Sequence, residues 1–91
     1  MKFMVTWKIA PSHMTPAVKR FLETGGLPPK GVKMLGRWQG AGLGFALAEC
    51  KEGKALFEWM AEWSDHLDLA VHPVVEDREG AAVLRRVYKE R

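Results

Sequence analysis

The sequence predicts an α+β domain whose elements follow the order strand, helix, strand, strand, helix, strand. Two segments, residues 2–9 and 67–76, alternate their side chains with the period of two that is typical of a strand with one buried face, and two further segments between them are extended runs joined by a short glycine-rich connection. Two segments instead repeat apolar side chains every three or four residues, which indicates amphipathic helices. Glycine, proline and short polar stretches separate these segments where turns are needed. Because the chain has 91 residues, we expect one domain over residues 1–91.

Residues 2–9 form the first predicted strand, with Phe3, Val5 and Trp7 on the same face. Thr15 then offers a side-chain oxygen as the N-cap of a helix, and the proline after it fits the first helical turn. Apolar side chains at helical spacing continue to a Gly-Gly-Leu-Pro-Pro stretch. This stretch predicts the end of the first helix.

Residues 31–39 and 43–50 are two extended segments joined by Gly-Ala-Gly, a connection of hairpin length. We therefore predict that the two segments pair as antiparallel strands. The connection does not match a dinucleotide-binding loop, because its glycine spacing is wrong and it joins two strands instead of opening a helix.

The most regular helical pattern covers residues 54–65. Its apolar side chains recur at positions i, i+3, i+4 and i+7, while acidic side chains gather on the opposite side. The apolar set is Leu56, Trp59, Met60 and Trp63. We interpret both tryptophans of this helix as core residues, because they share the stripe with aliphatic neighbours. Trp7 and Trp38 are then the tryptophans left to stack on a ligand.

Residues 67–76 alternate again and predict the last strand. Pro73 indicates an edge strand, because proline cannot donate a hydrogen bond to a neighbouring strand. Asp77 is positioned to cap a final helix over residues 78–89. Basic residues gather in this C-terminal stretch: Arg78, Arg85, Arg86, Lys89 and Arg91.

This order closes most simply as a ferredoxin-like, four-stranded antiparallel sheet with both main helices on one face and a C-terminal helix. The other face of the sheet is then uncovered. If the larger side chains face the helices, the uncovered set is Met4, Leu35, Ala46, Ala48, Ala70 and Val74. Such a face is too apolar to stay in contact with water, so we predict a homodimer in which a second sheet covers it.

Several short motifs are distinctive across residues 1–77. They are Met-Lys-Phe-Met-Val-Thr-Trp at the start, Gly-Val-Lys-Met-Leu-Gly-Arg-Trp over 31–38, Phe-Ala-Leu over 45–47 with Glu49, Glu-Trp at 58–59 and 62–63, and Pro-Val-Val-Glu-Asp over 73–77. In these motifs the chain resembles a group of small bacterial proteins, known only as a domain of unknown function, among the dimeric α+β barrel proteins.

The resemblance implies the dimeric α+β barrel fold, and it brings no assigned catalytic residue. Function in that wider group depends on the residues of the cleft, not on the fold. The chain departs from the family pattern at Lys51-Glu52-Gly53, where similar sequences have an Asp-Pro helix start. We therefore expect a weaker cap on the second helix.

The charge, the cysteine count and the length of the apolar runs argue against some classes of binding partner and against membrane insertion. Fourteen Lys and Arg against eleven Asp and Glu give a net charge of +3, without a basic stripe that carries interleaved aromatic residues. This pattern argues against nucleic-acid binding. A single cysteine and the absence of a leader-like apolar segment predict a cytoplasmic protein. No apolar run approaches the roughly 18 residues of a membrane span, so we expect no membrane insertion.

Polar residues on the predicted open face are the candidates for a ligand site. Thr6 and Lys8 share one face of the first strand, and Arg37 and His72 are predicted to join them from other strands. Cationic and hydroxyl groups between apolar walls would suit a small anionic or carbonyl-bearing molecule, and Trp38 adds an aromatic surface. The alternative is that these are solvated strand-end charges and a surface histidine. A shift of one residue in register would also move a side chain to the other face.

Other reactive residues do not form a recognisable motif. Asp65, His66 and Asp68 lie near a helix end without a fourth ligand at a known spacing, so we predict no metal site there. His13 has no partner nearby in the sequence, and Cys50 has no adjacent histidine to activate it. No cofactor-binding motif is present, and we predict no bound cofactor.

Two functional hypotheses follow. In the first, the cleft between the two sheets of a dimer binds a small organic molecule and could transform it by oxygenation or isomerisation. In the second, the protein is a non-catalytic dimer, a sensing or protein-interaction module whose inter-sheet space is filled by side chains. Enzyme and sensor both remain open at this stage.

Overall fold

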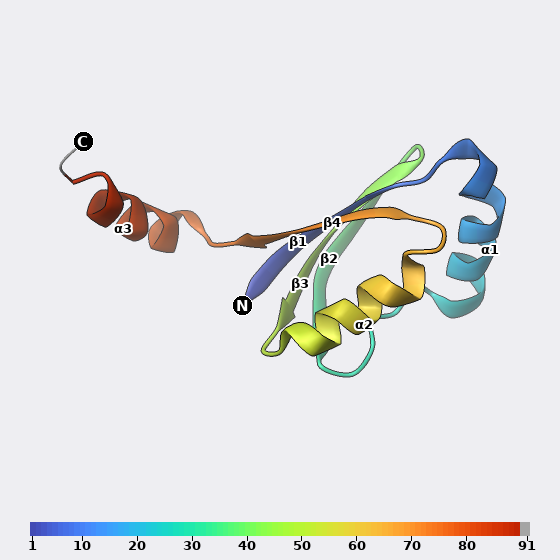
Figure 1. The fold of residues 1–91 in the computed structure, drawn as a ribbon, viewed down its shortest axis with the longest axis horizontal. Coiled ribbons are helices and arrows are strands. Elements are labelled where there is room, and N and C mark those ends of the chain that lie inside the picture. The colour runs from blue at the N-terminus through green and yellow to red at the C-terminus, as the bar shows by residue number, and fades with distance from the viewer. Residues whose placement is uncertain (90–91) are drawn as a thin grey trace.

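The computed structural model describes residues 1–89 and contains the predicted alternation of strands and helices (Figure 1). The elements are β1 (Lys2–Lys8), the 3-10 turn η1 (Pro11–His13), α1 (Met14–Thr24), β2 (Val32–Gly40), β3 (Leu43–Cys50), α2 (Gly53–Trp63), β4 (Asp68–Val74) and α3 (Asp77–Val87). The α+β order predicted from the sequence is confirmed. Arg91 of the basic C-terminal cluster lies outside the described residues.

The four strands form one antiparallel sheet in the order β2-β3-β1-β4. This order, with helices in the β1–β2 and β3–β4 connections, is the ferredoxin-like topology. β2 and β3 are joined by the predicted tight turn, in which Gly42 has a φ of 72°. β4 lies at one edge of the sheet, which confirms the interpretation of Pro73 as an edge-strand residue.

The core lies on the face of the sheet that α2 covers. Val5 is 1% exposed and lies between Ala46 of β3 and a valine of β4. α2 adds Leu56 and Trp59 to the same cluster. Burying each of these two side chains stabilises the fold by about 1.5 to 3 kcal/mol.

The prediction that Ala46 and Ala48 lie on the open face is wrong. Both alanines are fully buried and share the face of Val5. Small side chains in β3 allow the bulky Trp59 of α2 to come close to the sheet, so size alone did not predict which face is covered. The larger side chains of this strand, Leu43 and Phe45, are on the open face instead.

A β-bulge in β2 changes which of its side chains face the helices. Met34 pairs with Ala48 but Gly36 pairs with the next residue of β3, so Leu35 is an extra residue on β2. Beyond the bulge the alternation is shifted by one position. Arg37 therefore lies on the helix-covered face.

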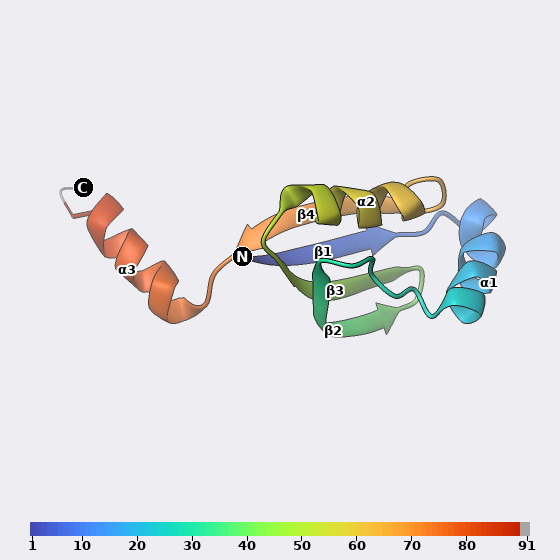
Figure 2. The ribbon, with the colours of Figure 1, turned by 90° about the horizontal axis from the view of Figure 1, so that it is seen from below.

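α1 follows β1 after the 3-10 turn η1, and its N-terminal cap differs from the predicted one. The 3-10 turn η1 leads directly into the helix, so His13 is the N-cap and Thr15 is already inside the helix. Gly25 ends α1 in the left-handed conformation with a φ of 74°, as the Gly-Gly stretch predicts. Figure 2 shows α2 running along the sheet, while α1 stands beyond one end of it.

α3 extends away from the other elements at the opposite end of the sheet from α1 (Figures 1 and 2). Its N-cap is Glu76, and Asp77 is the first helical residue and not the cap. The N-cap of α2, Glu52, makes no side-chain capping hydrogen bond, which agrees with the weak start expected there. None of the helices within residues 1–89 has the length and hydrophobicity to cross a bilayer.

Candidate ligand cavity between the sheet and the helices

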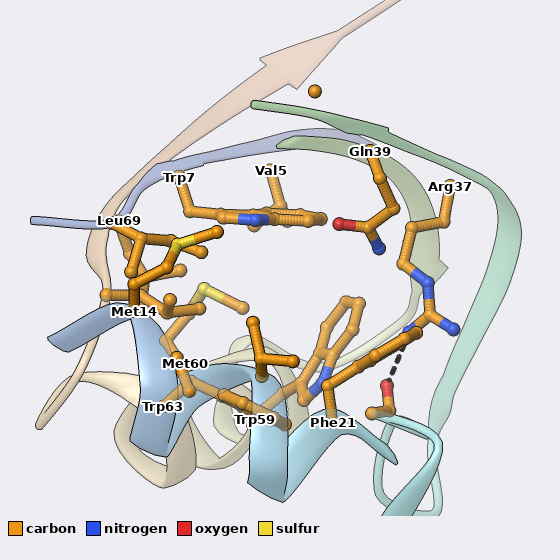
Figure 3. Close-up of a pocket in the computed structure, with 16 residues that line it drawn as sticks. Val5, Trp7, Met14, Phe21, Arg37, Gln39, Trp59, Met60, Trp63 and Leu69 are labelled. Atoms are coloured by element: carbon orange, nitrogen blue, oxygen red, sulfur yellow. Dashed lines mark hydrogen bonds between the residues drawn. The ribbon is translucent and has the colours of Figure 1, made fainter. Parts of the chain in front are cut away.

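A cavity of about 120 Å³ separates the sheet from α1 and α2 at the end of the sheet where β1 finishes (Figure 3). Its walls are almost entirely apolar. Aromatic rings come from the sheet and from both helices: Trp7, Phe21, Trp59 and Trp63. The cavity therefore shares its sheet and α2 walls with the core, and α1 adds the remaining wall.

Trp7 lies on the sheet side of the cavity with its indole flat against the strands (Figure 3). Gly44 of β3 is its cross-strand partner. A Cβ atom at Gly44 would overlap the Trp7 indole, so only glycine at this position allows the ring to lie flat. The glycine-rich hairpin thus shapes one wall of the cavity.

Arg37 holds the end of α1 against β2. Its guanidinium donates hydrogen bonds of 2.9 Å to the carbonyl oxygens of Gly25 and Gly26. The same group stacks over Phe21 of α1, with Cζ 4.9 Å from the ring centroid. Since two carbonyls and an aromatic ring already contact the guanidinium, Arg37 positions the wall of the cavity and is engaged within the fold.

Gln39 supplies the polar group of the cavity that is not engaged within the fold. Two residues after Arg37 on β2, it lies on the same face, and its side-chain amide points into the cavity (Figure 3). Within the described residues this amide makes no hydrogen bond. An amide both donates and accepts hydrogen bonds, so it can pair with a hydroxyl or a carbonyl group.

Polar contacts also attach α1 to the corner between α2 and β4. Arg20 donates to both carboxylate oxygens of Asp65, at 2.9 and 2.7 Å, and to the carbonyl oxygen of Glu62 at 2.8 Å. The Arg20 hydrogen bonds lower the pKa of Asp65 from 3.8 to about 2. His13 and His66 contact each other through their Nδ1 atoms, 3.1 Å apart.

These contacts show what the Asp-His-Leu-Asp stretch does in the fold. Asp65 binds Arg20 of α1, and His66 contacts His13, which lies just before α1 and for which the sequence offered no partner. Across residues 1–89 there is no group of three His, Cys, Asp or Glu side chains arranged to hold a metal ion. Met14 and Leu67, the neighbours of the two histidines in the chain, line the cavity, so this contact lies at its rim.

The structure separates the site residues predicted from the sequence. Thr6, Lys8, Trp38 and His72 lie on the open face of the sheet, where Thr6 and Trp38 are both opposite Phe45 of β3. Arg37 lies on the other face, so the expectation that it shares a cleft with them is wrong because of the bulge in β2. Ligand binding by the four open-face residues stays a prediction.

Sequence reasoning missed the polar residue of the cavity and part of its walls. Trp59 and Trp63 were interpreted as core residues, and Trp59 is 4% exposed, but both also line the cavity. Gln39 was missed because its face depends on the bulge. The pairing of Gln39 with Gly44, which places it on the cavity face, follows only once the bulge is known.

The fold and the cavity define a small α+β domain of ferredoxin-like topology with an apolar, aromatic-lined cavity between its sheet and its helices. The chain belongs to the DUF3303 family, a domain of unknown function, whose model matches residues 1–88. The resemblance to a family of unknown function, inferred from the sequence motifs, is therefore confirmed.

Solved structures similar to this chain share little sequence with it. MupZ from Pseudomonas fluorescens is 15% identical, with a TM-score of 0.44 over 97% of this chain and 83% of that chain. A mutant of MhuD with two manganese protoporphyrin IX molecules bound per active site is 16% identical, with a TM-score of 0.37 over 84% of this chain and 95% of that chain. No curated protein matches the sequence.

Proposed function

We propose that this protein binds a small, largely apolar organic molecule of about the size of one aromatic ring in the cavity between the sheet and helices α1 and α2. The observation that carries the proposal is the combination of aromatic walls with one inward-pointing amide, Gln39 (Figure 3). Ligand sites are typically apolar cavities in which a few polar groups fix the orientation of the ligand.

The energetics of the cavity favour a ligand. The cavity is open to solvent on one side, since Val18 and Gln39 in its lining are exposed. A ligand that fills it would cover apolar side chains that otherwise contact water, which is favourable by about 25 cal/mol per Å² of apolar surface. An apolar cavity of about 150 Å³ is known to bind benzene.

The residues that line the cavity also indicate the chemical class of the ligand. The planar Trp7 indole on the sheet side favours a flat ring, because offset stacking of aromatic rings is favourable. Gln39 favours a ligand with one hydroxyl or carbonyl group. An anion is less well suited, because the cation that lines the cavity, Arg37, already binds two carbonyl oxygens. A phenol-like molecule meets these requirements.

The test compares phenol with benzene as probes, with binding followed through the indole N–H signals in NMR titrations. Replacing Gln39 by Leu keeps the apolar packing and removes the amide. We expect phenol to bind about fivefold more weakly to this variant, the equivalent of one neutral hydrogen bond, and benzene to bind unchanged. The matched control is Thr6→Val, which removes a hydroxyl from the open face and should leave both affinities unchanged.

Two results would overturn the assignment. If neither probe shifts the signals of Trp7 or Trp59 in the unaltered protein, the cavity does not take a ligand of this class. If Thr6→Val weakens phenol binding and Gln39→Leu does not, the ligand site is on the open face, with Thr6, Lys8, Trp38 and His72.

We also propose that two copies associate through the open face of the sheet. Trp38, Phe45 and Leu43 are 57%, 43% and 37% exposed on this face, and Leu35 beside the bulge is 40% exposed. Neighbouring apolar side chains of this size on one face are typical of a protein interface. A two-fold axis would let the same face cover itself, so that one set of residues serves both copies.

A further inference from the structure

α3 is an amphipathic helix that does not pack against its own domain. None of its residues is buried, and it lies beyond the end of the sheet where β1 begins (Figures 1 and 2). Ala81, Leu84 and Val87 share one side at helical spacing, and the last two are 56% and 43% exposed. Ala82 and Arg86 lie on the opposite side. We call the first three residues the α3 stripe.

A short amphipathic helix such as α3 is stabilised mainly by packing its apolar side against another surface. α3 has 11 residues, and isolated helices shorter than about 12 to 15 residues are marginal in water. Most of the stability of a helix in a protein comes from packing its apolar side. The α3 stripe has the pattern for such packing, but no residue of Asp77–Val87 is buried against the rest of the described chain.

The connection to β4 directs α3 away from its own core. Only Val75 and Glu76 separate the two elements, and Glu76 forms an ion pair with Lys2 at the start of β1. This ion pair joins the connection to the end of the sheet at β1. Figure 1 shows that α3 then lies on the side of the sheet away from α2, which is the side of the open face.

We propose that α3 is an arm that packs its stripe against a second copy of this chain, the copy that covers the open face. The proposal rests on the homodimer proposed above. A copy seated on the open face comes to the side of the sheet on which α3 lies, so the arm meets the partner without bending back across its own domain. Two-fold symmetry makes the contact reciprocal, because each copy both extends an arm and receives one.

The main test is a pair of substitutions that introduce the same charge on opposite sides of the helix. Leu84→Glu places a charge in the α3 stripe, and Ala82→Glu places the same charge on the polar side. By sedimentation equilibrium of the full chain, we expect Leu84→Glu to weaken dimerisation at least about tenfold, from the lost burial of a leucine side chain. Ala82→Glu should leave the dissociation constant within about twofold of the unaltered value.

A second measurement shows which molecule the arm contacts. A benzophenone side chain is introduced at Val83, at the edge of the stripe, and the protein is irradiated as the full chain. We expect a photoproduct with the mass of two copies, formed also when a labelled copy is mixed with an unlabelled one. A photoproduct confined to the mass of one copy would mean that α3 folds back on its own domain.

The results of these experiments distinguish the proposed arm contact from the proposed open-face homodimer. If the unaltered protein is a dimer and both glutamate variants dimerise equally well, the arm is wrong and the open-face homodimer stands. If the unaltered protein is monomeric at micromolar concentration, both proposals are wrong. If Leu84→Glu abolishes binding to anionic lipid vesicles but leaves the dimer unchanged, the stripe faces a membrane surface and the arm is overturned.

Discussion

Two glycines leave the space into which the indole rings of two tryptophans extend. Trp7 extends flat across Gly44 on the cavity face, and Trp38 extends across Gly36 on the open face. At both glycines a Cβ atom would come within contact distance of the indole ring. The strand register places Trp7 on the cavity wall and Trp38 on the proposed interface, and each glycine leaves the space that its indole ring occupies.

This arrangement predicts a specific cost for Gly44→Ala. The added methyl group must displace the Trp7 indole towards the cavity, so we expect a loss of about 1 to 3 kcal/mol in the free energy of unfolding, the usual cost of overpacking. Urea denaturation followed by tryptophan fluorescence measures it. Gly53→Ala is the control, because a Cβ atom there meets nothing within 4 Å. Equal stability of the two variants would show that Trp7 does not depend on Gly44.

At the scale of elements, those with a strong local sequence signal were predicted correctly. The irregularity in β2 has no such signal and was not predicted. The hairpin, the stripe of α2 and the edge position of Pro73 follow from turn chemistry, helical spacing and a missing donor. The bulge at Leu35 has no local signal, yet it decides which face Arg37 occupies. The predicted site was therefore divided between two faces, although the fold was predicted correctly.

α1 is the element whose attachment most affects the cavity, because it forms one wall and has only Ala17 buried. Two arginines hold it: Arg37 binds the carbonyl oxygens just after its C-terminal end, and Arg20, within the helix, binds the corner between α2 and β4. These polar contacts keep the wall in place where few apolar side chains do. Conditions that weaken them should loosen α1 before they unfold the sheet.

Asp65→Asn tests this attachment through its dependence on pH. The pKa of Asp65 in the folded chain, about 2, is below its ordinary value of 3.8 because Arg20 stabilises the carboxylate. The ion pair therefore stabilises the fold at pH values above 3.8, and its contribution is lost as the pH falls toward 2. We expect the urea midpoint of Asp65→Asn to lie below that of the unaltered protein at a pH of about 6 and to approach it near pH 2.5 or so.

The control for this series is Asp68→Asn, the same chemical change three residues away at the start of β4. Because no hydrogen bond or ion pair attaches Asp68 to α1, its midpoint should follow the unaltered protein at both pH values. A difference between Asp65→Asn and the unaltered protein that persists at the lower pH would contradict an ion-pair origin of the effect.

Considered as a whole molecule, the chain leaves two apolar surfaces uncovered on the same side. One is the open face of the sheet and the other is the α3 stripe. A domain of 91 residues buries a smaller share of its surface than a larger domain does, so intermolecular packing is a substantial source of stability for it. Association through the open face would cover one surface and bring a second copy to the other.

Association through the open face should depend on where an apolar residue lies and not only on how exposed it is. Leu22 on α1 is 74% exposed, and Phe45 at the centre of the open face is 43% exposed. If exposure alone caused association, Leu22→Glu would have the larger effect. We expect the reverse, because Phe45 lies among Thr6, Trp38 and other residues of a continuous face, and a charge there would be buried in the dimer without a partner. Light scattering after size-exclusion chromatography should give a monomer for Phe45→Glu and a dimer for Leu22→Glu, and a dimer for both would place the interface elsewhere.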